Sequence, residues 1–245
     1  MAFVQTLINS LAVKGRKILR FAGVPLDIEP NAHDVLVPIC HLHPYNLPDI
    51  QKHLLSLNAQ DRYLRFGYAA NDEQITHYVQ SLNFKRDEIY GIFNRDLQIL
   101  AVAHLAIYDN ENEKELKQIS AEFGVSVHAS ARGRGYGHQL FKRALMHARN
   151  ANASTILIHA LSENAPMLKI ARKAGATLER DGSETQALLK VPKGNLRTLM
   201  AELFTDQYAQ TNYSIKEDVK NFWYFMTQVQ EIRQGVRAGR HQSAE

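Results

Sequence analysis

Three closely spaced glycines, Gly133, Gly135 and Gly137, separate a strand-like segment from a helix-like one. Residues 116–127 alternate apolar and polar side chains, which is the period of a half-buried strand. From Tyr136 onward the apolar residues follow helical spacing. At such a junction the first N–H groups of the helix have no partner inside it, and the helix dipole adds partial positive charge. We therefore expect an α/β fold with an anion-binding turn.

The glycine spacing discriminates between kinds of phosphate-binding loop. His138 and Gln139 follow Gly137, where a P-loop needs a lysine and a hydroxyl residue. The G-x-G-x-x-G spacing of a dinucleotide-binding turn is also missing, as is the acidic residue about twenty positions later. Gly124 lies inside the preceding strand, where a glycine marks a bulge or a ligand close to the backbone. These features favour a ligand with a diphosphate and an extended amide arm, such as coenzyme A, over a plain tight turn.

The stretch "VSVHASARGRGYGHQLFKRAL" resembles motif A of the GNAT superfamily of N-acetyltransferases. Arg132, Gly135 and Gly137 fill the family pattern R/Q-x-x-G-x-G/A, and Asn164 stands at the asparagine that contacts the pantetheine arm in the family's next motif. The resemblance covers residues 34–191. It implies a mixed, mostly antiparallel central sheet flanked by helices, with additional N- and C-terminal helices outside the family core.

The same resemblance implies acetyl-CoA as co-substrate. We expect no metal, because the single cysteine, Cys40, excludes a cysteine cluster and the pair His41 and His43 lacks further ligands. The turn and the resemblance together predict a set of cofactor-binding residues: Val125, Ser126, Val127, Arg132, Gly133, Arg134, Gly135, Tyr136, Gly137, His138 and Asn164.

A closer resemblance concerns the acceptor. The segments "LNAQDRYLRFGYA" and "ENAPMLKIARKAGA" are similar to the acetyltransferase domain of bacterial Pat-type protein-lysine acetyltransferases. Their large acyl-CoA-synthetase-like partner region is not found in this sequence. The resemblance implies a protein lysine as acceptor. A small amine or polyamine acceptor and a non-catalytic acyl-CoA-binding regulatory module are the alternatives, since one fold hosts many functions.

Acetyl transfer to an amine needs a base, because a lysine-type amine is mostly protonated at pH 7. Glu122 is the expected base; it is two residues before Gly124, on the polar face of the strand, and aligns with a Pat-type glutamate. The alternative is a surface or ion-paired glutamate. His104, in the preceding strand, is expected roughly opposite Glu122, to orient it or share the proton; otherwise it is a structural histidine.

Two further features concern the thioester. The backbone N–H of Val125, freed by a bulge at Gly124, is expected to polarise the carbonyl as an oxyanion donor does. Many GNAT enzymes place a tyrosine, as general acid, four residues before the glycine of "AGA", and this chain has Ala171 there. A thiol with a pKa near 8.5 still leaves as a thiolate at pH 7 with limited help.

The charge distribution and the turn-forming residues divide the chain into five parts. Residues 1–22 form an amphipathic basic helix, which either packs on its own domain or a partner subunit or contacts anionic membrane. Residues 23–33 are a linker, 34–191 the acetyltransferase domain, 192–234 a helical extension and 235–245 a disordered tail. The N-terminal segment is too interrupted by charge to span a bilayer. We expect a cytoplasmic protein that forms homo-oligomers.

The net charge of +4 comes entirely from residues 1–22, which carry four basic and no acidic residues. The remaining 25 basic residues balance 25 acidic ones. This composition implies no extended basic face, and we expect no nucleic-acid partner.

Apolar spacing and turn residues predict the remaining elements. Strands are expected over residues 34–40, 88–93, 97–108, 154–161, 177–182 and 184–191. Helices are expected over residues 47–57, 71–82, 164–176 and from about 195, with a capping box at Asn71 and Gln74 and a second helix start at Ser214 and Glu217.

Overall fold

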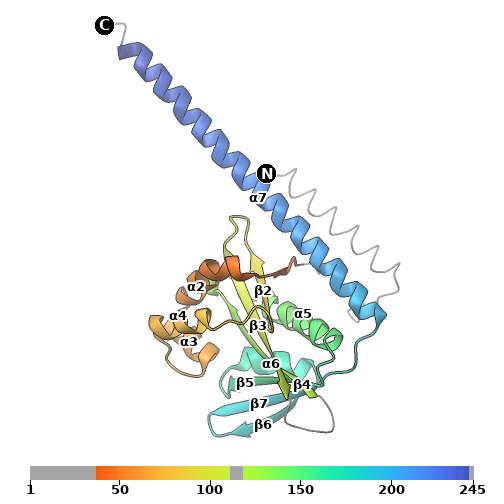
Figure 1. Cartoon of the computed structure of the whole chain (residues 1–245). Coiled ribbons are helices and arrows are strands. Elements are labelled where there is room, and N and C mark those ends of the chain that lie inside the picture. The colour runs from red at the N-terminus through yellow and green to blue at the C-terminus, as the bar shows by residue number, and fades with distance from the viewer. Residues whose placement is uncertain (1–36, 111–117, 243–245) are drawn as a thin grey trace.

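A seven-stranded sheet forms the centre of the structure, a computed structural model that describes residues 37–110 and 118–242 (Figure 1). The strand order is β1-β2-β3-β4-β5-β7-β6, and all neighbours are antiparallel except β4 and β5. The strands are β1 (Cys40–His41), β2 (Glu88–Phe93), β3 (Ile99–Asn110), β4 (Gln118–Val127), β5 (Thr155–Leu161), β6 (Thr177–Asp181) and β7 (Glu184–Lys190). The expected mixed, mostly antiparallel sheet is confirmed.

Helices cover both faces of the sheet. They are η1 (Pro44–Asn46), α2 (Leu47–Leu55), α3 (Ala59–Phe66), α4 (Asp72–Gln80), η2 (Ala129–Ala131), α5 (Tyr136–Asn150), α6 (Ala165–Lys173) and α7 (Leu196–Gln242). On one face α5 and α6 bury a core in which the rings of Phe123 and Phe141 meet edge to face at 5.0 Å. On the other face α2 and α4 bury a second core around Ile50, Ile75 and Val102. The odd and even residues of β4 therefore face different helices.

The sheet opens between β4 and β5. These parallel strands pair over only three positions, Ser120–Glu122 with Thr155–Leu157. On its other side β4 stays in regular register with β3 along its whole length. The bulge expected at Gly124 is therefore not there; the recorded shift in pairing with β3 falls between Ile92 and Phe93 on β2. The strands separate because β4 remains paired with β3 along its length, while β5 remains paired with β7.

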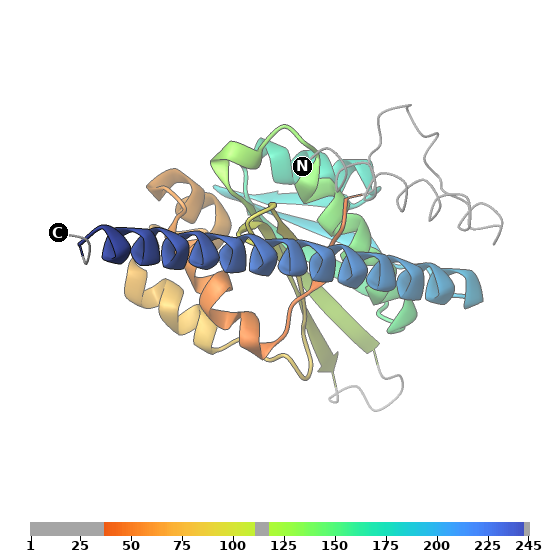
Figure 2. The same cartoon turned by 90° about the horizontal axis from the view of Figure 1, so that it is seen from above.

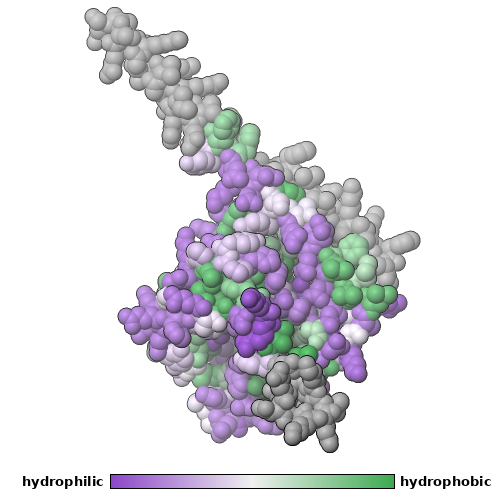
Figure 3. Space-filling view, in the orientation of Figure 1, coloured by the Kyte–Doolittle hydropathy of each residue, from purple (hydrophilic) through white to green (hydrophobic). Residues whose placement is uncertain are grey.

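The helix α7 spans 47 residues, which corresponds to a length of about 70 Å. Asn195 caps its start, exchanging hydrogen bonds with Thr198 at 2.9 and 3.0 Å. Only its first part packs on α5 and β1, and its last turns project beyond the domain (Figures 1 and 2). In the first turns of α7 the exposed apolar residues are Leu196, Leu199, Met200 and Leu203, and hydrophobic surface is visible there (Figure 3).

The continuity of α7 corrects two expectations. No helix starts at Ser214, and residues 235–242, expected to be disordered, continue the helix. Residues 196–234 contain no glycine or proline, so nothing interrupts the helix before the potential cap at Ser214. Gly235 and Gly239 each cost about 1 kcal/mol in a helix interior, which does not end it here.

A buried charge cluster attaches α7 to the domain. Glu202 of α7 accepts hydrogen bonds from Arg143 and His147 of α5, both at 2.8 Å, and Arg143 also reaches Asp206 at 2.7 Å. Burial alone would raise the pKa of Glu202, but hydrogen bonds from His147, Asn150 and Arg143 lower it to about 2. The carboxylate therefore stays ionised and holds α7 against α5.

Most other elements lie close to their expected positions. The capping box of Asn71 and Gln74 is present, and the β6–β7 hairpin is confirmed. The strand expected over 34–40 is reduced to Cys40–His41 within the described residues. The helix and linker expected over 1–22 and 23–33 lie outside them. In the part of the chain that the structure describes, no helix is long and apolar enough to cross a membrane.

Candidate active site

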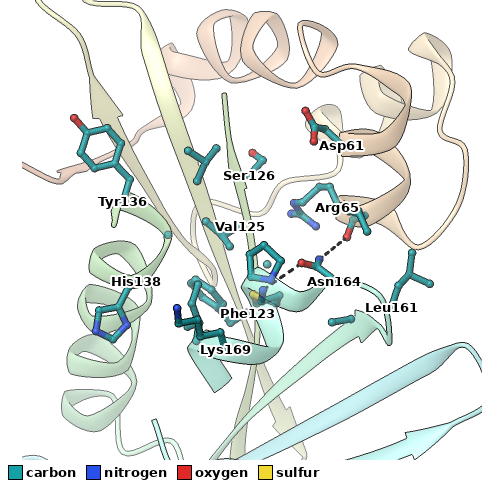
Figure 4. A pocket seen from close by; sticks show the side chains of 18 of the residues that line it. Asp61, Arg65, Phe123, Val125, Ser126, Tyr136, His138, Leu161, Asn164 and Lys169 are labelled. Carbon is teal, nitrogen blue, oxygen red and sulfur yellow. Dashed lines mark hydrogen bonds between the residues drawn. The ribbon is translucent and has the colours of Figure 1, made fainter. Parts of the chain in front are cut away.

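A cleft of about 830 Å³ lies where β4 and β5 separate. Its walls come from β4, the glycine turn, the first turn of α5, β5, α6 and α3 (Figure 4). Twelve of the thirteen expected site residues are Asn164 and residues of β4, the glycine turn and the start of α5. The cleft is lined by Glu122, Val125, Ser126, Val127, Arg132, Gly133, Gly135, Tyr136, Gly137, His138 and Asn164. Arg134 is the exception in this set: its guanidinium turns back to the Ser130 carbonyl at 3.5 Å.

The glycine turn leaves the start of α5 open toward the cleft. Gly135 caps α5 with φ of +76° and no side chain, a conformation that favours glycine. The first helical hydrogen bond runs from Gln139 N–H to the Gly135 carbonyl at 3.0 Å, so the N–H groups of residues 136–138 precede the helical ladder. A Cβ on Gly137 would lie 3.3 Å from Ile170, so α5 and α6 pack closely here. This arrangement fits the diphosphate of coenzyme A.

Arg132 provides positive charge beside this turn and forms an ion pair with Asp61 of α3. Its side chain is half exposed, whereas that of Asp61 is nearly buried. Two lysines of α6, Lys169 and Lys173, also line the cleft. Basic groups on two elements therefore surround the anion-binding turn, and one of them already has a carboxylate partner.

The backbone of β4 presents hydrogen-bonding groups to the opening. His128 donates its N–H to the Leu100 carbonyl on the β3 side, and the Ile119 carbonyl accepts from Ser154 on the β5 side, both at 2.8 Å. Because these directions alternate along a strand, the N–H of Val125 points away from β3. Pairing with β5 ends at Glu122, so this N–H faces the cleft. The separation of the strands, and not a bulge, leaves it available.

Glu122 lies on the face of β4 that α3 covers and lines the same cleft as the glycine turn. Across the strand pair it faces Ala106. Tyr108 is its neighbour on β3: burial raises the pKa of the Tyr108 hydroxyl, and the Glu122 carboxylate adds to the effect. Glu122 therefore lies on the wall of the cleft beside the Tyr108 hydroxyl, and its role as a base stays a prediction.

His104 faces Gly124 across the strand pair, two positions away from the expected partner Glu122, and it does not line the cleft. Its Nδ1 meets the Tyr78 hydroxyl at 2.9 Å, and its Nε2 meets Asp87 at 3.1 Å. Burial, followed by the charge of Arg65, lowers the pKa of His104. A neutral ring with its hydrogen on Nε2 satisfies both contacts.

Two expected ligand contacts are occupied within the protein. The Ser126 hydroxyl meets His53 Nε2 at 2.9 Å, and burial lowers the pKa of His53 to about 4. Asn164 caps α6 by accepting from Met167 N–H at 3.2 Å and donates to the Leu64 carbonyl at 3.2 Å. Its side chain therefore joins α6 to α3, and contact with the pantetheine arm stays a prediction. Ala171 has no ionisable side chain and is fully buried in the core, so this position supplies no acid.

The sequence reasoning missed Arg65, which lines the cleft from α3. A Cβ on Gly124 would lie 2.8 to 2.9 Å from its guanidinium, so the space that this glycine leaves is filled by Arg65 (Figure 4). The helix itself was also missed, although Asn58 caps it by accepting from Asp61 N–H at 2.8 Å. The available signal was "YLRF", residues 63–66, within the segment "LNAQDRYLRFGYA" that resembles the Pat-type domain.

Residues 40–177 match the acetyltransferase (GNAT) domain family. Among solved structures, the GNAT domain of S. lividans PAT is similar, with a TM-score of 0.53 at 15% identity, over 66% of this chain and 99% of that one. Spermidine N-acetyltransferase from Vibrio cholerae, in complex with CoA and spermine, gives a TM-score of 0.49 at 16% identity, over 64% of this chain and 96% of that one.

The fold and the family match define the class of the protein, an acetyltransferase of the GNAT type. Because the family match covers more than half of the sequence, the chain belongs to the acetyltransferase (GNAT) domain family. Within the described residues, no group of three or more histidine, cysteine or acidic side chains could hold a metal ion.

Proposed function

We propose that the protein transfers an acetyl group from acetyl-CoA to a primary amine, and that this amine is a protein lysine. One observation carries the proposal: Glu122 lines the same cleft as the glycine turn and the Val125 N–H. A base, an anion cradle and a carbonyl-polarising donor then share one site. The likeness to the GNAT domain of S. lividans PAT supports the fold, and the Pat-type sequence segments favour the lysine acceptor.

The chain's own groups divide into two sets. The N–H groups at the start of α5, with Arg132, hold the diphosphate, and the open edge of β4 holds the amide arm. Acetyl-CoA supplies the thioester, an acyl donor with a thiolate leaving group. The Val125 N–H donates to the carbonyl oxygen as negative charge develops there.

Glu122 acts on the acceptor. It receives a proton from the ammonium, directly or through water, so that the neutral nitrogen attacks the carbonyl carbon. The new C–N bond forms as the C–S bond breaks, the sulfur leaves with the electron pair, and the second proton of the nitrogen passes to the departing thiolate or to water. We propose that His104, which does not reach the cleft, is a positioning residue. It holds the Tyr78 hydroxyl in place through the hydrogen bond to its Nδ1.

The test follows thiol release from acetyl-CoA with a panel of lysine peptides and small amines. Glu122→Gln is expected to lower kcat/KM by at least about 100-fold at pH 7, the lower range for general base catalysis, with unchanged acetyl-CoA affinity. Glu179→Gln, an exposed position on β6, is the matched control. A Glu122→Gln rate equal to that of the wild type removes Glu122 from the mechanism.

A non-catalytic acyl-CoA-binding module is the second candidate, favoured by Ala171 at the usual tyrosine position. Tight acetyl-CoA binding without thiol release for every acceptor would support it. A small-amine or polyamine enzyme would release thiol with small amines and not with peptides. The cytoplasmic location, membrane contact through residues 1–22 and homo-oligomer formation stay predictions, to be tested by fractionation, co-sedimentation with anionic liposomes and light scattering.

A further inference from the structure

The guanidinium of Arg65 is held flat against β4. It occupies the place of a side chain at position 124, with Nη1, Cζ and Nη2 lying 2.8, 2.9 and 2.9 Å from a Cβ built on Gly124. Nη2 donates a hydrogen bond to the Tyr78 hydroxyl at 2.7 Å. The rings of Phe66 and Tyr78 flank the cation at 5.2 and 5.3 Å from its centre. These contacts fix a positive charge on the wall of the cleft.

A chain of hydrogen bonds behind Arg65 keeps it in place. The Tyr78 oxygen accepts from Arg65 and its hydroxyl donates to neutral His104, which donates in turn to Asp87. Asp87 is also bound by Arg86 at 2.7 Å and by the Ile107 N–H at 3.1 Å. The carboxylate at the end of the chain is thus already neutralised, so Arg65 keeps its positive charge at the cleft end.

Arg65 has no carboxylate partner within the described residues. Asp61, one helical turn earlier on α3, pairs with Arg132 instead. Glu122, two residues from Gly124 on the same face of β4, makes no ion pair with Arg65 among the described contacts. A partly buried cation is costly without a partner, so an anionic group on a ligand would be stabilised here.

We propose that Arg65 binds a carboxylate of the acceptor, and that the enzyme therefore prefers amines that carry a carboxylate nearby. Glu122 and the guanidinium over Gly124 are two strand residues apart, which sets a separation of about 7 Å between amine and carboxylate. The planar guanidinium matches a carboxylate through paired N–H donors. This rests on the proposed function, since Glu122 is the group that receives the proton of the amine.

The carboxylate can belong to a small amino acid or to an acidic residue beside an acceptor lysine. The first arm of the test compares 6-aminohexanoate with 6-aminohexanamide, which share one amine and differ in charge. The second arm compares blocked peptides in which lysine is flanked by aspartate or by asparagine. Spermidine, which has no carboxylate, is the cationic probe.

The wild type is expected to favour the carboxylate member of at least one pair by about 10-fold or more in kcat/KM, the range for a hydrogen bond to a charged group. Arg65→Gln should remove this preference while the KM for acetyl-CoA stays unchanged. Gly124→Ala should act in the same way, because its Cβ displaces the guanidinium and leaves Arg65 in the sequence. Arg180→Gln, exposed on β6, should keep the preference.

Equal rates within both pairs would overturn the carboxylate site and leave the acetyltransferase proposal standing. A preference that survives in both Arg65→Gln and Gly124→Ala would also overturn it. If no probe releases thiol, the proposed function fails, and calorimetry with CoA present still tests Arg65. Tighter binding of 6-aminohexanoate than of its amide, lost in Arg65→Gln, supports the site; equal binding refutes it.

Discussion

Replacing Glu202 with glutamine should release much of the energy that fixes α7 to the domain. The change keeps the shape of the side chain and removes the charge that Arg143 and His147 contact at 2.8 Å. The difference between an ordinary pKa of 4.5 and a value of about 2 corresponds to about 3 kcal/mol. Measured losses of one partner from a buried ion pair, about 3–5 kcal/mol, agree with this magnitude.

We expect Glu202→Gln to lower the free energy of unfolding by about 3 kcal/mol at pH 5.5, where Glu202 and His147 are both charged. For a chain of this size the melting temperature should fall by about 6–12 °C. Asp218→Asn, an exposed site on the same helix, should change the free energy by less than about 0.5 kcal/mol. Urea unfolding followed by circular dichroism measures both variants.

The contribution of Glu202 to the free energy of unfolding changes with pH in a defined direction. The pKa of Glu202 is lower in the folded protein, so its contribution is complete above pH 4.5 and is lost as the pH falls toward 2. The difference in the free energy of unfolding between the wild type and Glu202→Gln should therefore decrease as the pH falls from 4.5 toward 2. A difference in the free energy of unfolding of less than about 0.5 kcal/mol at pH 5.5, or one that does not decrease on acidification, would refute the reasoning.

Three further predictions concern the cleft and the core. Asp61→Asn should tighten acetyl-CoA binding by up to about fivefold in calorimetry, because the ion pair, which is open to solvent on its Arg132 side and is worth about 0.2–1 kcal/mol, no longer competes for Arg132; weaker binding would contradict this. Gly135→Glu should abolish acetyl-CoA binding, since it strains a φ of +76° and adds negative charge to the anion site; an unchanged affinity for acetyl-CoA would refute the assignment of the glycine turn as the diphosphate site. Phe123→Ala should cost about 3–5 kcal/mol in urea unfolding, as its fully buried ring packs on Phe141; a loss below 1 kcal/mol would contradict the packing.

The elements predicted well are those whose signal is local. The alternation before Gly124 and the helical spacing after Gly137 are properties of neighbouring residues, and both elements formed where expected. The glycine pattern also located the part of the cleft wall that β4, the glycine turn and the start of α5 form. Local patterns failed where two signals compete: Ser214 and Glu217 form a start signal, yet the residues before them already favour a helix, and α7 continues.

The missing parts of the site depend on contacts between distant segments. The position of His104 opposite Gly124 follows from the register of β3 and β4, which alternation alone leaves undetermined. Arg65 is 59 positions from Gly124, so no sequence window joins them. The glycine at position 124 predicts a bulge or a close ligand, whereas the space beside it is filled by a side chain of α3.

The short helix α3 touches both halves of the cleft. Asp61 at its start holds Arg132 beside the glycine turn, and Arg65 one turn later lies on Gly124. A ligand that takes Arg132 from Asp61 therefore acts on the helix that carries Arg65. Thermodynamic linkage makes this reciprocal: any factor by which acetyl-CoA changes acceptor affinity must equal the factor by which the acceptor changes acetyl-CoA affinity. In the proposed arrangement, the eight residues of α3 thus contact the binding sites of both substrates.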